Sequence, residues 1–318
     1  MLKLENVRKV YRVGTFGGKE LHAVSGVTFE VDDGEVVSLI GESGSGKSTI
    51  GKMILQLTPL SGGSIIYNGQ NVAELSGAHL KDYYRSVQGV FQDPFSSYNP
   101  IFKADRIFEK VRQEYFPHVS GVEWSARVQE AMLDVGLNPE QCLNKFPHQL
   151  SGGQLQRLLI ARALLLDIDL LVADEIISML DASTRIDVLN LLADLKQRGL
   201  SILFITHDLS LGYYISEKAV ILSQGYVVES GPTESVYNRP YHPYTRMLMS
   251  SVPRLDEKWE DVEGKIAPDA AEAALPDGYS YFERRFSGGI RGMDGDGPDS
   301  DPVQIEIEPG HFVACRAV

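Results

Sequence analysis

The segment GESGSGKST, residues 41–49, constrains the fold of this chain more than any other segment. It follows the apolar run VVSLI (36–40) and precedes the helix-like run IGKMILQL (50–57). It matches the pattern G-x-x-x-x-G-K-[ST] in the strand–loop–helix context of a phosphate-binding loop. A chance match in a chain of this length is on the order of one in a hundred at average glycine usage. The sequence therefore predicts an α/β fold that binds a phosphate group, and we call residues 41–49 the P-loop.

The glycines of the P-loop explain how it would hold phosphate. Because they lack Cβ atoms, Gly41, Gly44 and Gly46 let backbone N–H groups turn inward around phosphate oxygens. The following helix adds its positive N-terminal end. Lys47 is expected to reach the β- and γ-phosphates, and Ser48 to bind Mg²⁺. The predicted nucleotide-binding residues of the P-loop are Gly41, Ser43, Gly44, Gly46, Lys47, Ser48 and Thr49.

A second segment, LLVADEIISMLD (170–181), runs from four apolar residues into the adjacent carboxylates Asp174 and Glu175. A parallel strand beside the P-loop strand would end at the same crevice of the sheet. Asp174 is then expected to hold Mg²⁺, and Glu175 to orient and deprotonate the attacking water. The alternative is a pair of solvated acids leading into a turn. The P-loop favours the catalytic interpretation, because Mg²⁺ would offset the repulsion between the two carboxylates.

A third segment, HQLSGGQLQRLLIARALL (148–165), predicts a capped helix. Ser151 and Gln154 have the spacing of a capping box. Leu155, Leu158 and Leu159 fall on one helical face, which we expect to be buried. A serine cap followed by two glycines leaves N–H groups at a positive helix end, which predicts a second anion site. An ordinary capped helix is the alternative.

The remaining pattern favours a parallel α/β sheet with a helical insertion. Strand-like segments open the chain, and Asn68-Gly69 between apolar runs predicts a β-hairpin. Helical periodicity dominates residues 105–166. After that, strand and helix patterns alternate, with helices expected over 183–198 and near 209–217. Such alternation is typical of a parallel sheet.

Composition limits the classes of function. Of the 318 residues, 43% are hydrophobic, which is enough for a sizeable core. The net charge of −13 argues against a nucleic-acid partner. The opening MLKLENVRKVYRV lacks the apolar core of a signal peptide, and no apolar run reaches the roughly 18 residues of a membrane span. Two cysteines, Cys142 and Cys315, predict a reducing compartment rather than a disulfide framework.

The last part of the chain differs from the rest in charge. Residues 256–318 hold 15 acidic and 6 basic residues. Within them, GGIRGMDGDGPDSD (288–301) has the composition of a loop or flexible segment. We therefore expect an acidic, partly flexible C-terminal region that is distinct from the α/β core.

The motif LSGGQ between a P-loop and an acidic strand end resembles the ATP-binding subunits of ABC transporters. GVFQDPFSSYNP (89–100) and YHPYTRMLMSSVP (241–253) are similar to the oligopeptide/dipeptide importer ATPases and their oligosaccharide and nickel relatives. The resemblance implies a P-loop NTPase fold. Its parts are a RecA-like parallel sheet core, an N-terminal antiparallel β subdomain, an inserted α-helical subdomain and a C-terminal extension. The implied domains are an ATPase domain over 1–235, with the helical subdomain at about 90–165, and an extension over 236–318.

The same resemblance implies roles for further residues. Tyr11 corresponds to an aromatic that stacks on adenine, with a plain strand tyrosine as the alternative. Gln92 corresponds to a glutamine that contacts Mg²⁺ and water and links the nucleotide to the membrane partner. His207 corresponds to a histidine that contacts the γ-phosphate and positions Glu175. Ser151, Gly152 and Gly153 are expected to bind the γ-phosphate of ATP held by an opposite subunit. Asp181 corresponds to the D-loop aspartate of the family, and the predicted nucleotide-binding set also includes Gln154 and Asp181. The implied catalytic set is Lys47, Gln92, Glu175 and His207, and the implied Mg²⁺ ligands are Ser48, Gln92 and Asp174.

The implied function is ATP hydrolysis that powers solute import at the cytoplasmic face of the cell membrane. The partners implied are a second ATPase subunit, either a related chain or another copy, together with two transmembrane permease subunits and an extracellular solute-binding protein. Two alternatives are a soluble ABC ATPase without a transport role and a weakly hydrolysing half of a heterodimeric ATPase pair. The solute stays open among oligopeptides, dipeptides, oligosaccharides and metal, because its choice belongs to the partner subunits.

The chain departs from the family pattern at two places. Ile176, Ile177 and Met179 stand where relatives have Pro, Thr and Ala, which leaves the stiffness of this loop and the rate of hydrolysis open. Some relatives bind an iron–sulfur cluster through a cysteine-rich C-terminal pattern, of which this chain keeps Cys315. Because such clusters need four thiolates as a rule, we expect no cluster and a colourless protein.

Overall fold

The structure, a computed structural model, describes residues 1–14, 18–251, 275–276, 278–282 and 301–317. The chain forms two compact units: Met1–Glu74 with Phe204–Val318, and Leu75–Leu203. We call them the first and the second unit. Of the segment 288–301 predicted to be a loop, only Asp301 lies within the described residues.

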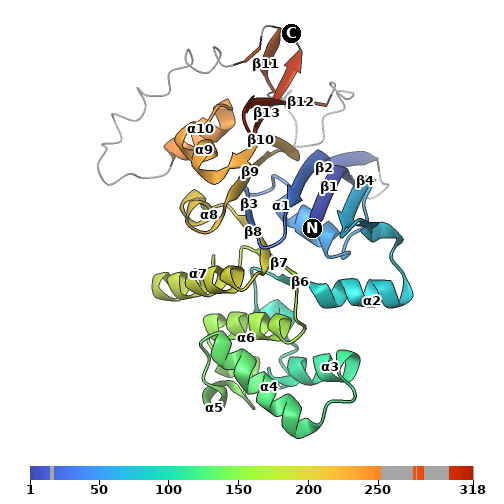
Figure 1. Cartoon of the computed structure of the whole chain (residues 1–318), viewed down its shortest axis with the longest axis vertical. Coiled ribbons are helices and arrows are strands. Elements are labelled where there is room, and N and C mark those ends of the chain that lie inside the picture. Colours follow the sequence, from blue (N-terminus) through green and yellow to red (C-terminus); the bar gives the residue numbers. More distant parts are fainter. Residues whose placement is uncertain (15–17, 252–274, 277, 283–300, 318) are drawn as a thin grey trace. The chain divides into compact units, whose positions relative to one another are not determined.

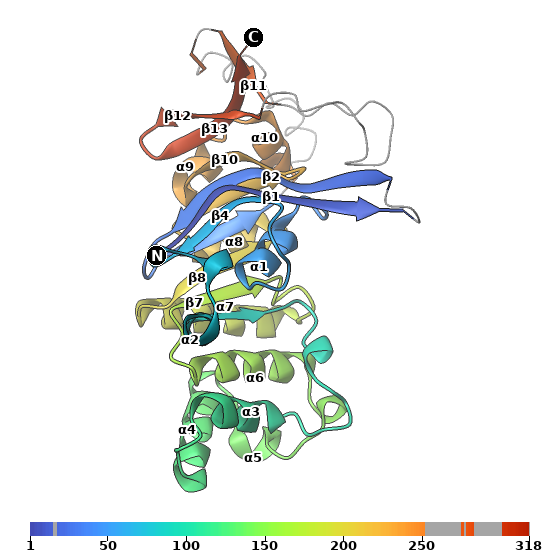
Figure 2. The same cartoon turned by 90° about the vertical axis from the view of Figure 1, so that its right-hand side faces the viewer.

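An antiparallel sheet opens the first unit, with the strand order β2-β1-β4-β5. Figure 2 shows β2, β1 and β4 together. In register, Leu2 of β1 lies opposite Val31 of β2 on one side and Tyr67 of β4 on the other. Alternation along β1 buries Leu2 and Leu4 completely. The strands are β1 (Leu2–Val13), β2 (Lys19–Val31), β4 (Gly62–Tyr67) and β5 (Gln70–Asn71). The predicted N-terminal antiparallel β subdomain is therefore present.

The predicted hairpin is confirmed. Tyr67 of β4 pairs with Gln70 of β5, so the turn holds only Asn68 and Gly69. Both turn residues have positive φ, 47° and 79°. Positive φ at both central positions is the requirement of a type I′ turn, which Asn-Gly meets at little steric cost.

The second sheet of the first unit combines parallel and antiparallel pairs. β3 and β9 run parallel, with Ile40 opposite Ile221, and β10 returns antiparallel to β9. The C-terminal strand β13 then pairs with β10, and β11 and β12 pair with β13. The strands are β3 (Val36–Ile40), β9 (Lys218–Ser223), β10 (Tyr226–Pro232), β11 (Tyr279–Tyr281), β12 (Val303–Glu308) and β13 (His311–Ala317). The described parts of the acidic C-terminal region thus extend the sheet of the first unit (Figure 1).

Four helices accompany this sheet: α1 (Lys47–Ile54), α8 (Leu209–Ile215), α9 (Thr233–Asn238) and α10 (Pro243–Ser250). A core cluster joins the sheet to α8 and α9 and consists of Ile40, Leu209, Ala219, Ile221, Val228 and Val236. Tyr244 and Leu248 of α10 pack against it. Strand β8 (Ser201–Thr206), which is buried along its whole length, contributes residues to both units.

The second unit consists of two parallel strands and a group of helices. Val90 of β6 lies opposite Ala173 of β7. The elements are α2 (Gly77–Ser86), β6 (Val87–Val90), α3 (Arg106–Tyr115), α4 (Gly121–Asp134), α5 (Pro139–Cys142), α6 (Gly152–Leu164), β7 (Leu170–Asp174) and α7 (Ala182–Gln197). Both figures show α3, α4, α5 and α6 side by side. Within the described residues, no helix is long and apolar enough to cross a bilayer.

Candidate functional site

The P-loop connects a buried strand to a helix whose first turn has no side-chain cap. All five residues of β3 are buried, and α1 begins at Lys47. Gly46 is the residue that precedes the helix; its φ is 109°, and as a glycine it forms no side-chain cap hydrogen bond with the first turn. The first N–H groups of a helix lack intrahelical partners, and the helix dipole is positive at that end. The loop therefore presents an anion-binding end.

Two glycines of the P-loop are required by close contacts. A Cβ on Gly41 would lie 2.1 Å from the carbonyl oxygen of Leu222, and a Cβ on Gly46 would lie 2.5 Å from that of Ala23. Gly44 has open space around it, but its φ of 81° lies in the left-handed region that glycine adopts most easily. The P-loop thus has the cradle geometry that a triphosphate needs, with the backbone close to β9 and β2.

Lys47 places its ammonium group inside this loop. The side chain is buried, and Nζ donates to the carbonyl oxygens of Gly41 at 2.7 Å and Glu42 at 2.8 Å. The charge is therefore held by carbonyl oxygens from the start of the loop. Ser48 and Thr49 follow in α1 and are half-buried, and Ser43 and Gly44 are exposed at the tip of the loop. This arrangement fits Mg²⁺-bound ATP, since it combines N–H donors, one ammonium group and a hydroxyl at one helix start.

Tyr11 and His207 also belong to the first unit. Tyr11 lies in β1 opposite Leu21 of β2, is partly exposed, and has the Lys9 ammonium 4.9 Å from its ring centroid. His207 is exposed and directly follows β8. The next residue, Asp208, caps α8 by accepting from Ser210 N at 2.9 Å.

The acidic pair in the second unit ends strand β7. Asp174 is the last strand residue and is buried, while Glu175 is half-buried and has φ 50°. A positive φ is uncommon for a residue with a Cβ and is concentrated at functional sites. The carbonyl oxygen of Glu175 accepts from both the N–H and the hydroxyl of Ser178, at 3.1 and 2.9 Å. These two bonds fix the turn that carries Glu175.

The loop after Glu175 contains three residues that depart from the family pattern, and two of them are buried. Ile176 and Ile177 are buried, whereas Met179 is 63% exposed. Arg185 of α7 donates to the carbonyl oxygens of Leu180 at 2.8 Å and of Ser178 at 3.1 Å. The buried apolar side chains and the Arg185 guanidinium together hold this loop.

The predicted capping box at the start of α6 is confirmed. Ser151 Oγ accepts from Gln154 N at 3.2 Å, and Gln154 Oε1 accepts from Ser151 N at 2.9 Å. The predicted apolar face is buried, and its members are Leu155, Leu158 and Leu159. A Cβ on Gly153 would lie 2.7 Å from Thr184 Cγ2, whereas a Cβ on Gly152 would meet nothing within 4 Å. The second unit thus brings the LSGGQ motif against the start of α7.

Asp181 provides the cap of α7. Its carboxylate accepts from Ser183 Oγ at 2.6 Å, Thr184 N at 3.1 Å and Thr184 Oγ1 at 2.8 Å. The hydroxyl of Ser183, followed by the donors of Thr184, lowers the pKa of Asp181 well below its usual range. Asp181 is therefore ionised at neutral pH and adds negative charge at a helix N-terminus, where the dipole favours it.

Gln92 lies in the loop after β6 and is exposed. Sequence reasoning missed two residues that hold this loop. Gln156 of α6 is buried and donates from Nε2 to the carbonyl oxygen of Phe91 at 3.2 Å. Tyr98 donates to the carbonyl oxygen of Leu155 at 3.1 Å, and burial raises its pKa. A polar residue between buried leucines was the available signal, because buried polar groups need partners.

The predicted site residues are divided between the two units. The P-loop, Tyr11 and His207 belong to the first unit. The second unit holds Gln92, Ser151, Gly152, Gly153, Gln154, Asp174, Glu175 and Asp181. Their action on one nucleotide stays a prediction. Cys315, the cysteine considered for a cluster, is buried in β13, and burial raises its pKa to about 11. The absence of an iron–sulfur cluster likewise stays a prediction.

Comparison with known proteins identifies the class. Residues 24–178 match the family described as ABC transporter, and residues 228–287 match the one described as oligopeptide/dipeptide transporter, C-terminal region. The oligopeptide transport ATP-binding protein OppF of Bacillus subtilis is 37% identical over 295 residues, 92% of this chain and 90% of that protein. The glutathione import ATP-binding protein GsiA of Escherichia coli K12 is 44% identical over 237 residues, 74% of this chain but 38% of that protein.

A solved structure supports the same class. The ATP-binding cassette MJ0796, in a dimeric post-hydrolysis state bound to ADP and Pi, has a TM-score of 0.66 and 30% identity. The match covers 73% of this chain and 99% of that one. The chain therefore belongs to the ABC transporter ATPases, and within them to the ATP-binding subunits that carry the oligopeptide/dipeptide C-terminal region.

Proposed function

We propose that the chain binds Mg²⁺-ATP and hydrolyses it to power the import of oligopeptides or dipeptides. The observation that carries this proposal is the P-loop itself. Its helix start has no side-chain cap from Gly46, a Cβ at Gly41 or Gly46 would clash with the backbone, and Lys47 is buried. The peptide and glutathione importers among its relatives support the class of solute.

For binding, the backbone N–H groups of the P-loop would surround the β- and γ-phosphates. Lys47 would exchange its two carbonyl partners for phosphate oxygens, which are stronger acceptors because they are charged. Ser43 and Thr49 would add hydroxyl contacts. Tyr11, which is partly exposed in β1, would stack on the adenine.

For hydrolysis, Ser48, Gln92 and Asp174 would hold Mg²⁺, which would neutralise charge on the phosphates when bound. Glu175 would accept a proton from the attacking water. The water oxygen would bond to the γ-phosphorus while the bond between that phosphorus and the bridging oxygen of ADP breaks. The fixed turn at Glu175 would keep the carboxylate in place for this step. His207 would contact the γ-phosphate and orient Glu175.

The P-loop and the LSGGQ motif are two proposed anion-binding sites for one nucleotide, so this function requires a partner chain. We propose a head-to-tail pair in which the P-loop of one chain and the LSGGQ motif of the other close on one ATP. Ser151, Gly152, Gly153, Gln154 and Asp181 would serve the opposite nucleotide. The second chain would be either a related ATPase or another copy of this one. The pair would dock on two transmembrane permease subunits at the cytoplasmic face of the membrane, supplied by an extracellular solute-binding protein.

Calorimetry and uptake together test this function. Titration of the chain with Mg²⁺-ATP should release heat, and a flat titration would contradict nucleotide binding. Cells that make the Glu175→Gln chain should lose uptake of a labelled tripeptide and keep uptake of labelled maltotriose. Loss of maltotriose uptake instead would identify oligosaccharides as the imported solutes. Unchanged uptake of both would contradict a transport role and favour a soluble ABC ATPase.

A further inference from the structure

A side chain of the oligopeptide/dipeptide C-terminal region, residues 228–287, contacts the P-loop. Tyr244 of α10 accepts a hydrogen bond from the backbone N–H of Glu42, with 3.1 Å between the two atoms. Glu42 is the second residue of the P-loop, and its carbonyl oxygen accepts a hydrogen bond from Lys47 Nζ. The Tyr244 hydroxyl therefore acts on the peptide segment that positions the phosphate-binding lysine.

The ring of Tyr244 is fixed by packing. It lies against the core cluster that contains Ile40, Ile221 and Val228. Ile40 is the last residue of β3 and immediately precedes the P-loop. The ring thus packs against the cluster to which the end of β3 belongs, and the hydroxyl reaches the P-loop.

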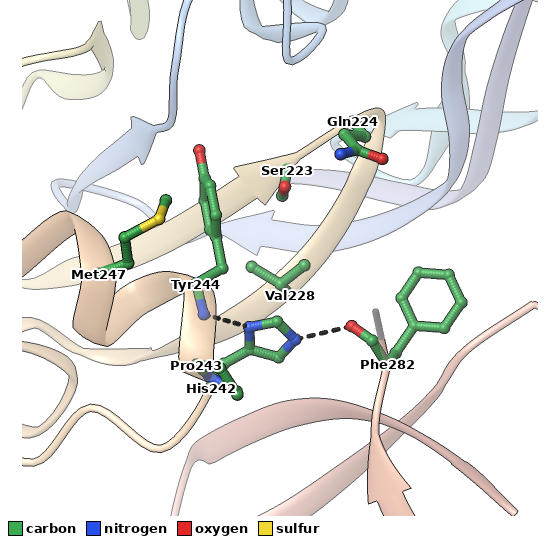
Figure 3. Close-up of a pocket in the computed structure, with 8 residues that line it drawn as sticks. All are labelled: Ser223, Gln224, Val228, His242, Pro243, Tyr244, Met247 and Phe282. Atoms are coloured by element: carbon green, nitrogen blue, oxygen red, sulfur yellow. Dashed lines mark hydrogen bonds between the residues drawn. The ribbon is translucent and has the colours of Figure 1, made fainter. Parts of the chain in front are cut away.

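The backbone of Tyr244 is fixed by a histidine. His242 is buried, and its Nδ1 accepts from Tyr244 N at 3.1 Å. Because Nδ1 accepts, the neutral ring carries its hydrogen on Nε2, which lies 2.8 Å from the carbonyl oxygen of Phe282. Figure 3 shows the imidazole between these two partners, with the Tyr244 hydroxyl directed away from it. The same residues line a pocket of about 290 Å³ together with Gln224 and Met247.

A buried carboxylate extends this network to the last strand. Glu229 of β10 is fully buried and accepts from the backbone N–H groups of Tyr241 at 2.9 Å and His242 at 3.0 Å. His311 Nε2 of β13, also fully buried, lies 2.7 Å from the Glu229 carboxylate. Buried polar groups tied in this way are costly to separate. The strand β13, the start of α10 and the P-loop are therefore joined through polar contacts.

We propose that Tyr244 is a positioning residue for the P-loop, so that the C-terminal region sets the affinity of the chain for ATP. The inference rests on the proposed ATP binding. Tyr244 does not act on the γ-phosphate; it holds the Glu42 peptide, and through it the carbonyl oxygens around Lys47. Loss of the hydroxyl would let the start of the loop move and lower the fraction of chains whose loop is ready to bind.

Tyr244→Phe tests the proposal, because phenylalanine keeps the ring in the core and removes only the acceptor. In calorimetry with Mg²⁺-ATP, we expect about a three- to tenfold weaker Kd, the range for loss of one neutral hydrogen bond. In the complex purified with its partner subunits, KM for ATP should rise by a similar factor while kcat stays unchanged. Hydrogen–deuterium exchange at the Glu42 amide should become faster in the nucleotide-free chain.

Tyr241→Phe is the matched control. Its hydroxyl donates to Glu308 at 2.8 Å and makes no hydrogen bond to the P-loop, so Kd and Glu42 exchange should stay at the wild-type values. Equal weakening in both variants would overturn the proposal, as would a wild-type Kd in Tyr244→Phe or unchanged exchange at Glu42. If the wild-type chain bound no Mg²⁺-ATP, both the proposed function and this inference would be wrong. If the wild-type chain binds Mg²⁺-ATP, the variants test only the positioning role of Tyr244.

Discussion

The two units of this chain prepare for a nucleotide in different ways. In the first unit, α1 begins at Lys47 after Gly46, which has no side chain to cap the helix, and the P-loop offers backbone N–H groups. In the second unit, Ser151 and Asp181 precede α6 and α7, and their side chains already accept hydrogen bonds from the first turns of these helices. An uncapped helix start can bind an anion with its full set of N–H groups, whereas a capped start has used part of that set.

This difference assigns different tasks to the two units. The backbone of the first unit would supply binding affinity, which depends on loop shape. The side chains of the second unit would supply hydrolysis and dimer contacts, which depend on particular functional groups. Substitutions in the two units should therefore affect different steps.

The largest effect is expected at Glu175. Glu175→Gln keeps the size of the side chain but removes the base, so turnover should fall by about 10²- to 10⁴-fold. ATP binding should stay unchanged, because the P-loop and the proposed Mg²⁺ ligands are intact in this variant. Steady-state ATPase assays of the assembled complex, with calorimetry alongside, measure both quantities. A variant that hydrolysed at the parent rate would exclude Glu175 as the base.

The next largest effect is expected at Lys47. Lys47→Ala removes a buried ammonium that would contact charged phosphate, so the affinity for ATP should fall by about 10- to 100-fold. Lys52→Ala is the control, because Lys52 is exposed in the last turn of the same helix. Calorimetric titration compares the two. Similar losses in both variants would mean that general charge, not the position of Lys47, sets the affinity.

A smaller effect on stability is expected at the glycines of the LSGGQ motif. Thr184 Oγ1 is held by Asp181, so Thr184 Cγ2 has little freedom to move from a Cβ on Gly153. Gly153→Ala should therefore be less stable than Gly152→Ala by about 1–3 kcal/mol. Urea denaturation of the two variants makes the comparison. Equal midpoints would show that α6 and α7 separate at little cost.

The smallest effect is expected at the cap of α7. Because the folded-state pKa of Asp181 is lowered, its contribution to stability is fully present above the unfolded-state pKa of about 3.9. It is lost as pH falls through the lower folded-state pKa. Asp181→Ala should lower Tm slightly at pH 7, and the difference from wild type should shrink below pH 4. A difference that grew in acid would contradict the charged cap.

Much of the local structure follows from short sequence patterns. The Asn68-Gly69 turn, the capping box at Ser151 and the buried leucine face of α6 were all predictable. So was the order of strand, loop and helix around Lys47. Each depends on residues a few positions apart, for which backbone geometry permits few alternatives.

The sequence by itself determined the class of fold and the identity of the phosphate loop, since glycine spacing and helical periodicity act within one element. Only the tertiary structure decided that β13 joins β10, that Gln156 holds the loop before Gln92, and that Tyr244 reaches Glu42. These pairs lie 65 or more residues apart. Their contacts exist because packing of whole elements brings the partners together, which no short pattern records.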